Sequence, residues 1–511
     1  MKGIHSAIID IGSNTIRLVI YRYSKGEGLQ EINNIKTVAR LRTYLQPDGN
    51  LSEEGINVLK NALITYKKIM EDFNVEKVKA VATAAIRQAR NKEDILLQME
   101  EQTGIKVEVL SEYEEAYFGY LAVVHTMDLP AAITIDIGGG STEITLFVNK
   151  KLHHTVSFPF GTVSLKQSFV SGEKINRKEK NRLSESLKNH FEKYSWMKDV
   201  RLPIVGIGGS ARNLAHIHQH LTGYPISGIH QYEMDREAFN RLNCFLGKQT
   251  LDELKQVDGL SSDRADIIEI ALVVFQSLMD IVNTDAFFVS KSGLREGLII
   301  HSVMQANPEA FRIDQIFEEY ANHFAHKCGR TAQEVDAMVR LTENFYLESC
   351  QWDLLQHRES HLQLLKKAAR LFSIGDYFET DSSNQHTFYL IANQSVPGLL
   401  HKDRIKVALL ASYKNKDYFR RLSKPFRSWF TRDELKTLQK FGALLKFVYS
   451  LNVSKKDVVK SIKMELEEDM LILYIFLKNR TAAEIYRAEN QKKHIEKLFR
   501  KKVKLEFINE G

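Results

Sequence analysis

The sequence predicts an α/β protein with two related α/β domains facing each other, then a helical domain and a small α/β C-terminal domain. First, the stretch "AIIDIGSNTIRLVIY" (7–21) nearly recurs as "AITIDIGGGSTEITLFV" (132–148). Second, strand and helix patterns alternate up to about Ile300, and the strand signal then fades until the C-terminal tail. Third, 511 residues are more than one hydrophobic core usually serves. The predicted domains are 1–128, 129–303, 304–449 and 450–511.

The first two domains follow one scheme. In the first, a hairpin turns around Gly12, "EKVKAVATAAIR" and "IKVEVLS" are strands, and "SEYEEAYFGYLAVVHTM" is a helix. In the second, a hairpin turns at 138–140, "LHHTVSFPFG" adds a strand, and "RLPIVGIGGSARNLA" predicts a strand, a glycine turn and a helix. The strand "DAFFVSKSG" and the helix "LREGLII" end this domain. Amphipathic helices then continue to Tyr449, and the tail predicts a hairpin, a helix over 481–502 and the strand "VKLEF".

Composition indicates an ordinary globular protein, with 43% hydrophobic and 26% charged residues. The chain opens on a strand pattern without an apolar signal region, and its longest apolar run, "MLILYIF", is too short to span a bilayer. The three cysteines lack CxxC spacing, which argues against a disulfide framework or a structural zinc site. We therefore expect a cytoplasmic protein without a transmembrane segment.

Positive charge is concentrated in one segment. Residues 401–450 hold thirteen Lys and Arg against four Asp and Glu. Two interpretations are open: a solvated helical surface, or a surface for a polyanion such as nucleic acid, membrane or a phosphate polymer. No zinc finger, RNA-binding aromatic motif or basic heptad region is present, so a nucleic-acid partner is not expected.

The duplicated turn indicates phosphate chemistry. In each copy an apolar strand ends at an aspartate, Asp10 or Asp136, and small residues follow. Glycines there are expected to adopt positive φ and to expose consecutive N–H groups, which with nearby hydroxyls form a nest for a phosphate oxygen. Because an aspartate repels phosphate unless a cation intervenes, the pattern also predicts a hard metal ion, Mg²⁺. The residues assigned to phosphate binding are Asp10, Gly12, Ser13, Asn14, Arg17, Gly138, Gly139, Gly140, Ser141, Gly208, Gly209 and Ser210.

When the two hairpins are aligned on their aspartates, a glutamate in one hairpin stands where the other has an arginine. Glu143 lies seven residues after Asp136, and Arg17 lies seven after Asp10. Glu143 is either a solvent-facing strand residue or a ligand of metal or water, and Arg17 would contact phosphate from the opposite wall. The third turn, "GIGGS" at 206–210, is either a plain strand-to-helix connection or an anion site at a helix N-terminus.

The motifs together resemble the acetate kinase, sugar kinase, heat-shock and actin superfamily, and within it the exopolyphosphatase and guanosine pentaphosphate phosphatase family. The motifs that carry this resemblance, over about 5–300, are "DIGSNTIRLVI", "VATAAIRQARN", "SEYEEA", "IDIGGGSTEI", "GIGGSARNLA", "LSSDRADII" and "GLREG". The resemblance implies two duplicated ribonuclease H-like (actin-like) domains facing a cleft. It also implies a homodimer and Mg²⁺, with a monovalent cation such as K⁺ left open.

The resemblance also assigns catalytic roles. The general base falls on Glu114, with Glu115 its neighbour, although Ser111 and Glu114 also match a helix capping box. Asp10, Asp136 and Glu143 match the acidic residues around the metal and the attacking water. Arg87 matches an arginine that neutralises the terminal phosphate, where a guanidinium can form bidentate bonds; without the resemblance it would be an ordinary surface arginine.

The expected activity is Mg²⁺-dependent hydrolysis of the terminal phosphate of inorganic polyphosphate, processive if the basic segment holds the polymer. Three alternatives are a guanosine pentaphosphate 5′-phosphohydrolase, a polyphosphate or alarmone sensor without catalysis, and a nucleotide-dependent kinase. The kinase has least support, because "SEYEEA" and "GLREG" fit the hydrolases.

The predicted helical domain departs from longer members of this family, which resemble metal-dependent HD phosphohydrolases there. Phe372 and Ser373 stand where the His and Asp of that motif are expected, and only His386 resembles a remnant. Since phenylalanine cannot ligate a metal, we predict a degenerate HD-like domain without a second active site. His361 and His386 are interpreted as ordinary histidines.

Overall fold

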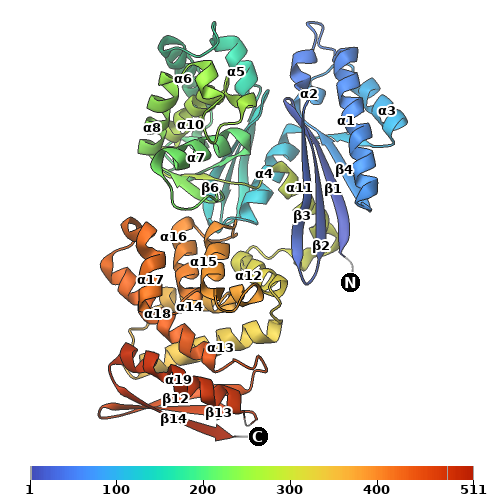
Figure 1. The fold of residues 1–511 in the computed structure, drawn as a ribbon. Coiled ribbons are helices and arrows are strands. Elements are labelled where there is room, and N and C mark those ends of the chain that lie inside the picture. Colours follow the sequence, from blue (N-terminus) through green and yellow to red (C-terminus); the bar gives the residue numbers. More distant parts are fainter. Residues whose placement is uncertain (1–2, 480, 510–511) are drawn as a thin grey trace. The chain divides into compact units, whose positions relative to one another are not determined.

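The computed structural model describes residues 3–479 and 481–509, which form two compact units, Met1–Ile316 and Phe317–Gly511 (Figure 1). The first unit contains two α/β lobes, which confirms the predicted fold class. The elements of its first lobe are β1 (Ile4–Ile11), β2 (Thr15–Ser24), β3 (Gly28–Val38), η1 (Leu41–Tyr44), α1 (Glu53–Asp72), β4 (Lys77–Ala82), α2 (Ala84–Arg87), α3 (Lys92–Thr103), β5 (Val107–Val109) and α4 (Glu112–Val124).

The second lobe repeats this plan with insertions. Its elements are β6 (Ala131–Ile137), β7 (Thr142–Val148), β8 (Lys151–Phe158), α5 (Thr162–Phe169), α6 (Arg177–Phe191), η2 (Ser195–Met197), β9 (Ile204–Ile207), α7 (Gly208–Thr222), β10 (Tyr232–Met234), α8 (Arg236–Lys248), α9 (Leu251–Leu254), η3 (Ser262–Arg264), α10 (Ile268–Val282), β11 (Phe287–Val289), α11 (Leu294–Ala306) and η4 (Pro308–Ala310).

The sheets show that the two lobes are duplicates. The first sheet has the order β3-β2-β1-β4-β5, and the second has the order β10-β11-β9-β6-β7-β8. Read from its other edge, the second sheet has the order β8-β7-β6-β9-β11-β10. The first five of these strands correspond in order to β3-β2-β1-β4-β5 of the first sheet, and β10 is an additional edge strand. In both, the opening hairpin is antiparallel and the central strand pairs in parallel with the strand that follows a helix or loop crossover. The duplication predicted from the hairpins therefore extends over the whole sheet.

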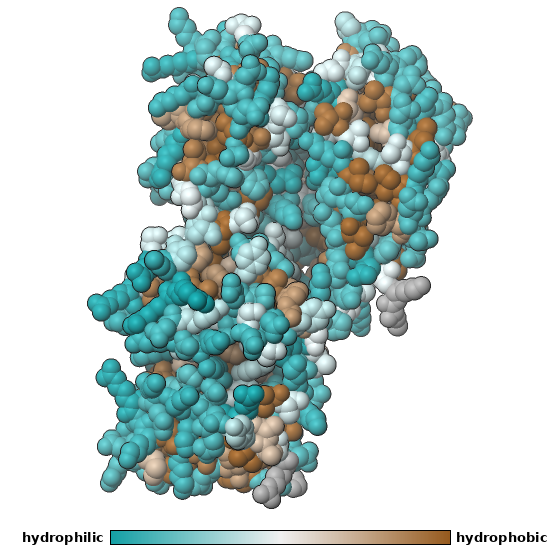
Figure 2. All heavy atoms as spheres, in the orientation of Figure 1, coloured by the Kyte–Doolittle hydropathy of each residue, from teal (hydrophilic) through white to brown (hydrophobic). Residues whose placement is uncertain are grey.

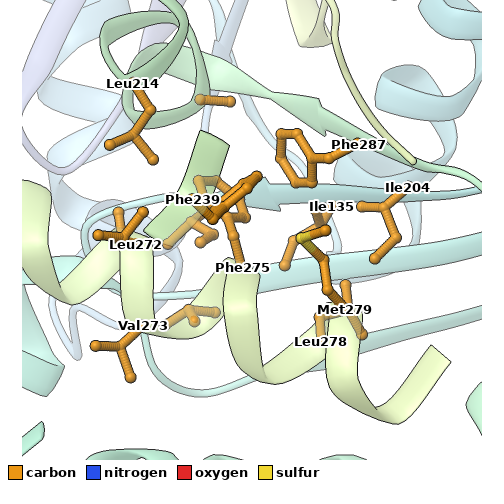
Figure 3. Packing of buried hydrophobic residues seen from close by; sticks show 14 of the residues in the cluster. Ile135, Ile204, Leu214, Phe239, Leu272, Val273, Phe275, Leu278, Met279 and Phe287 are labelled. Atoms are coloured by element: carbon orange, nitrogen blue, oxygen red, sulfur yellow. The ribbon is translucent and has the colours of Figure 1, made fainter. Parts of the chain in front are cut away.

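Apolar side chains on one face of the second sheet meet the buried helix α10 (Figure 3). Phe287 of β11 packs edge-on against Phe275 of α10 and Phe239 of α8, each with ring centroids 5.0 Å apart. Ile135 and Ile204, from the strands that carry the site residues, lie in the same core and are fully buried. A well-packed core under these strands holds their ends in place.

Two helices, α4 and α11, each pack on the sheet of the other lobe. Helix α4 packs on the second sheet, where the Tyr120 hydroxyl donates to the carbonyl of Lys150 at 2.8 Å. Helix α11 packs on α4 and on the first sheet, where the Tyr21 hydroxyl donates to Glu296 at 3.1 Å. The two helices approach closely at Gly297, where a Cβ would lie 1.9 Å from a backbone oxygen of α4. Each lobe therefore contributes one helix to the other.

The second unit combines helices with a small sheet, as predicted. Its helices are α12 (Ile316–Lys327), α13 (Ala332–Gln351), α14 (Glu359–Arg370), η5 (Ile374–Tyr377), α15 (Ser383–Asn393), α16 (His401–Ala411), α17 (Lys416–Ser423), η6 (Lys424–Trp429) and α18 (Arg432–Ser450). The strands β12 (Val459–Glu467), β13 (Met470–Leu477) and β14 (Lys502–Asn509) form one sheet, with α19 (Ala482–Phe499) as the crossover between the parallel pair β13 and β14.

The segment with the expected HD remnant is part of this unit's core. Phe372 is buried, with its ring centroid 5.1 Å from that of Tyr449, and Ser373 has a left-handed backbone with φ 55°. His361 packs edge-on against Phe441, and burial lowers its pKa. These side chains fill space by apolar packing.

No helix in the described part of the chain is long and apolar enough to cross a membrane.

Candidate active site

The two duplicated hairpins bring their polar residues into register. Asp10 at the end of β1 lies directly opposite Arg17 of β2, and Asp136 at the end of β6 lies directly opposite Glu143 of β7. Cross-strand partners share one face of a sheet, so each aspartate and its partner point the same way. The register confirms that Arg17 and Glu143 occupy equivalent positions on the second strand of each hairpin.

A cavity of about 160 Å³ lies where the strand ends of the two lobes meet. All three glycine turns line it, including Gly12, Asn14, Gly138 and Gly208. It brings together four carboxylates and five cationic side chains: Asp10, Glu115, Asp136, Glu143, Arg17, Arg212, Arg264, Lys291 and Arg295. Of the residues assigned to phosphate binding, only Ser210 is absent from the lining, because it is buried beneath the turn with its hydroxyl 3.4 Å from Nη1 of Arg264.

The glycines of the turns serve close approach more than positive φ. Only Gly208, at φ 82°, has the left-handed backbone that the sequence led us to expect; Gly12, 138–140 and Gly209 do not. At Gly139 a Cβ would lie 3.3 Å from Cβ of Ser13, and at Gly140 it would lie 2.4 Å from Nη1 of Arg42. A Cβ at either position would therefore press on the first lobe, whose side chains would have to shift.

The backbone of the second turn is oriented by helix α5. The carbonyl of Gly138 accepts from the N–H of Thr162, and the carbonyl of Gly139 accepts from the N–H groups of Val163 and Ser164. Among the described residues, the N–H groups of Gly139 and Gly140 have no hydrogen-bond acceptor. Consecutive unpaired N–H groups at a cavity suit an anion.

The aspartates are held close to cations. Burial raises the pKa of Asp10, against the lowering effect of Arg295, whose Nε lies 3.7 Å from the carboxylate. Burial also raises the pKa of Asp136 to about 6, partly offset by the charge of Arg212. A Cβ on Gly208 would lie 2.5 Å from Oδ1 of Asp136, so the carboxylate rests directly on the third turn.

Two glutamates, Glu115 and Glu143, line the cavity, and the charge of one acts on the other. Burial raises the pKa of Glu143 well above its ordinary value, and the charge of Glu115 adds to this; the Ser157 hydroxyl donates to Glu143 at 3.1 Å. Burial raises the pKa of Glu115 to about 7, although Arg87 donates to it at 2.9 Å. A carboxylate that titrates near neutral pH beside a bound phosphate is suited to general base catalysis.

The structure places the predicted base, Glu114, away from the cavity. Glu114 is exposed and does not line the cavity. Its carboxylate accepts from the backbone N–H and the hydroxyl of Ser111, at 2.8 and 2.7 Å, in the capping box of α4. These bonds lower its pKa. The next residue, Glu115, projects about 100° further around the helix and reaches the cavity instead.

Arg87 lies behind Glu115. Its Nη1 donates to the Leu110 carbonyl at 3.0 Å as well as to Glu115, and Arg87 is absent from the cavity lining. Its Nη2 is buried without a hydrogen-bond partner among the described residues. The contact to the terminal phosphate assigned to Arg87 remains a prediction. In the structure its guanidinium is hydrogen-bonded to the carboxylate of Glu115.

Most of the cationic side chains that line the cavity were not assigned from the sequence. Arg212, Arg264 and Arg295 lie in the motifs "GIGGSARNLA", "LSSDRADII" and "GLREG", which we used for the resemblance without assigning these side chains. Arg212 donates from Nε to the Gly208 carbonyl at 3.0 Å. Lys291 belongs to no motif, and only the fold brings it to the cavity.

The carboxylates suit a hard divalent cation. The charge of Asp10 raises the pKa of Asp136, and a bound cation would relieve this repulsion. Within the described residues, no group of three His, Cys, Asp or Glu side chains is placed to hold a metal alone. Mg²⁺ commonly takes one or two carboxylates and completes its shell with water and phosphate, so this donor set fits it.

The fold and the cavity define a class: a two-lobed actin-like protein with acidic and cationic groups gathered at paired glycine turns. The sequence profile of the Ppx/GppA phosphatase family matches residues 19–306, and that of Ppx/GppA phosphatase domain III matches residues 321–492. The first match covers more than half of the chain, so the protein belongs to the Ppx/GppA phosphatase family.

Individual relatives agree with this. A Ppx/GppA family member from Aquifex aeolicus is 30% identical in its crystal structure, with a TM-score of 0.54 over 60% of this chain and 99% of that one. An exopolyphosphatase from Cytophaga hutchinsonii, 22% identical, has the same fold, with a TM-score of 0.54 over 60% and 99%. A bifunctional 3-dehydroquinate synthase/phosphatase from Fusobacterium nucleatum is 26% identical over 310 residues, which are 58% of this chain and 46% of that protein. The chain thus spans less than half the length of this relative.

Proposed function

We propose that the protein is an exopolyphosphatase, which hydrolyses the terminal phosphate of inorganic polyphosphate and releases orthophosphate. The observation that carries this proposal is the position of Glu115. Its carboxylate, with a pKa raised to about 7, lines the same cavity as the duplicated phosphate turns. A kinase needs no such base for water, whereas a hydrolase does.

In the proposed reaction, different groups of the cavity bind the phosphates and activate the water molecule. The unpaired N–H groups of Gly139 and Gly140 would bind oxygens of the terminal phosphate, and the guanidinium groups of Arg212 and Arg264 would bind the phosphates behind it. Glu115 would orient a water molecule for in-line attack and accept its proton at the carboxylate. Arg87 would hold that carboxylate in place. Most of the acceleration would come from positioning and fixed charge.

Mg²⁺ is the proposed cofactor, with Asp10, Asp136 and Glu143 as the residues that would hold it directly or through water. When bound, it would neutralise charge that develops on the phosphate chain.

Polyphosphate is favoured over guanosine pentaphosphate by charge on the second unit. In and beside α17 and η6 the side chains of Lys414, Lys416, Arg420, Arg421, Lys424 and Arg427 are exposed. Figure 2 shows a hydrophilic surface over α16 and α17. A long polyanion gains from many such charges, whereas a single nucleotide does not. Guanosine pentaphosphate hydrolysis is the second candidate, because it trims a terminal phosphate by the same chemistry.

Phosphate release tests the proposal. Wild type, Glu115→Gln and Glu114→Gln are assayed with Mg²⁺ on long-chain polyphosphate and on guanosine pentaphosphate. We expect faster release from polyphosphate, loss of release in Glu115→Gln, and near-normal release in Glu114→Gln. A preference for guanosine pentaphosphate would select the second candidate. Binding of polyphosphate without release would make the protein a sensor.

A further inference from the structure

The two lobes of the first unit contact each other across the cavity. The second glycine turn contacts Ser13 and Arg42 of the first lobe, as shown by the space a Cβ would occupy at Gly139 and Gly140. Beyond these contacts, Lys36 of β3 donates to Asp263 of η3 at 2.9 Å. The structure therefore describes a closed arrangement of the lobes with an ion pair between them.

The Lys36–Asp263 pair is partly shielded from water. The side chain of Lys36 is 31% exposed and that of Asp263 is 14% exposed. Burial by itself would raise the pKa of Asp263, but the hydrogen bond and charge of Lys36 lower it overall. A shielded, charge-assisted hydrogen bond is stronger than an ion pair in free solvent.

Both partners of this ion pair are neighbours of cavity residues. Lys36 lies opposite Arg17 in the β2–β3 ladder, and Arg17 donates to Asn34, two residues before Lys36, at 2.9 Å. Asp263 precedes Arg264, whose guanidinium lies against the third turn. A Cβ on Gly209 would be 2.4 Å from Cζ of Arg264. The pair thus joins two cationic side chains of the cavity through their own segments.

The segment that carries Arg264 has anchors within its own lobe as well. The N–H of Ser261 donates to Asn213 of α7 at 2.7 Å, and Asp266 pairs with Lys166 of α5 at 2.8 Å. These contacts lie on either side of η3 and attach its flanks to the second lobe. The contact through Asp263 is different because it forms only when the first lobe is close.

We propose that Lys36 and Asp263 are positioning residues that couple closure of the two lobes to the placement of Arg264 over the third glycine turn. In the closed arrangement Arg264 is held where the phosphates behind the terminal one would bind. When the pair is broken, the lobes separate more easily and the substrate must supply the energy of closure. This inference rests on the proposed function for its kinetic consequence, and not for the closure itself.

Charge reversal and charge exchange test the pair. The variants are Lys36→Glu, Asp263→Lys and the double exchange, with Lys36→Met as a milder change in case reversal impairs folding. The control is Arg241→Glu, which breaks an exposed pair with Glu237 within α8. Circular dichroism and thermal melting establish that each variant is folded. The kinetic readout is kcat and KM for phosphate release from long-chain polyphosphate.

We expect each single reversal to raise KM roughly tenfold, equivalent to about 1.4 kcal/mol, with kcat changed less than threefold. The double exchange should recover most of this loss. If the pair had only a structural role, the single-reversal variants would be less stable and the double exchange would not restore KM. Unchanged KM in both single reversals, or no rescue in the exchange, would overturn the proposal.

A distance measurement separates this proposal from the proposed function. Spin labels are attached at residues 97 and 188, exposed positions on α3 and α6 of the two lobes, after Cys244, Cys328 and Cys350 are replaced. We expect a longer, broader distance distribution in each single reversal and a return towards wild type in the exchange. If wild type releases no phosphate from either substrate, the proposed function fails, and these distances still decide whether the ion pair holds the lobes. Identical distances in all variants would overturn the coupling.

Discussion

We predict that the pH dependence of hydrolysis follows from the environment of Glu115, the proposed base. The carboxylate must be ionised to accept a proton from water. Burial raises its pKa from 4.5 to about 7, and the Arg87 guanidinium at 2.9 Å limits that rise. A rise of this size disfavours the charged form by roughly 3 kcal/mol. About one tenth of the molecules would carry the active carboxylate at pH 6, and about nine tenths at pH 8.

The assay is kcat/KM for phosphate release, measured from pH 5 to pH 9 at constant ionic strength and saturating Mg²⁺. We expect activity to rise about tenfold per unit below pH 7 and to level off above it. Glu115→Gln should lose about 10²- to 10⁴-fold and lose the acid limb with it. Glu114→Gln should keep the profile and most of the stability, because a glutamine at this position can still accept from Ser111 in the capping box.

Two results would refute this reasoning. An acid limb centred near pH 4.5 would show that Glu115 is solvated like an ordinary glutamate. Loss of activity in Glu114→Gln, with activity kept in Glu115→Gln, would show that Glu114 is the catalytic base.

Three further predictions follow from single features of the structure. Arg87→Gln should shift the acid limb to higher pH, because Arg87 lowers the pKa of Glu115, whereas Arg90→Gln, at an exposed arginine three residues later, should leave the profile unchanged. Gly209→Ala should lower kcat/KM roughly tenfold, because the new Cβ would lie 2.4 Å from Cζ of Arg264 and displace that side chain. The control Gly247→Ala should be neutral, since only Nζ of Lys180 lies near its Cβ position, at 3.9 Å. Equal activity of the two variants would contradict a role for Arg264. Replacing Arg420, Arg421 and Lys424 with Gln should raise the half-saturating concentration of long-chain polyphosphate about threefold to tenfold without affecting tripolyphosphate, while the same change at the exposed Lys178, Arg182 and Lys188 of α6 should not.

The candidate site was only partly predictable, because some of its residues lie in local sequence patterns and others are brought together only by the fold. Asp10 and Asp136, with the turns that follow them, lie in a local strand–turn–strand pattern that is visible in the sequence. The opposition of Asp10 to Arg17 and of Asp136 to Glu143 follows from hairpin register over a few residues. Such features depend on near neighbours and survive in any fold that contains the hairpin.

The same local reasoning could not choose between Glu114 and Glu115. Adjacent residues of a helix point about 100° apart, so the choice depends on how α4 is rotated against the two sheets. That rotation is set by packing, including the contact of Tyr120 with the second lobe. The capping interaction of Ser111 was visible in the sequence, and it is the reason that Glu114 is turned away from the cavity.

By itself, the sequence determined the duplicated hairpins, the acidic strand ends, the order of the α/β lobes, the helical region and the final small sheet. These features are encoded in short-range periodicity and turn chemistry. Tertiary structure alone decided that α4 and α11 exchange lobes, that Glu115 faces the cavity, and that Arg212, Arg264, Lys291 and Arg295 converge there. The helix α4 and the segments that carry these cationic side chains are far apart in the chain, and only the packing of two complete lobes brings them to one cavity.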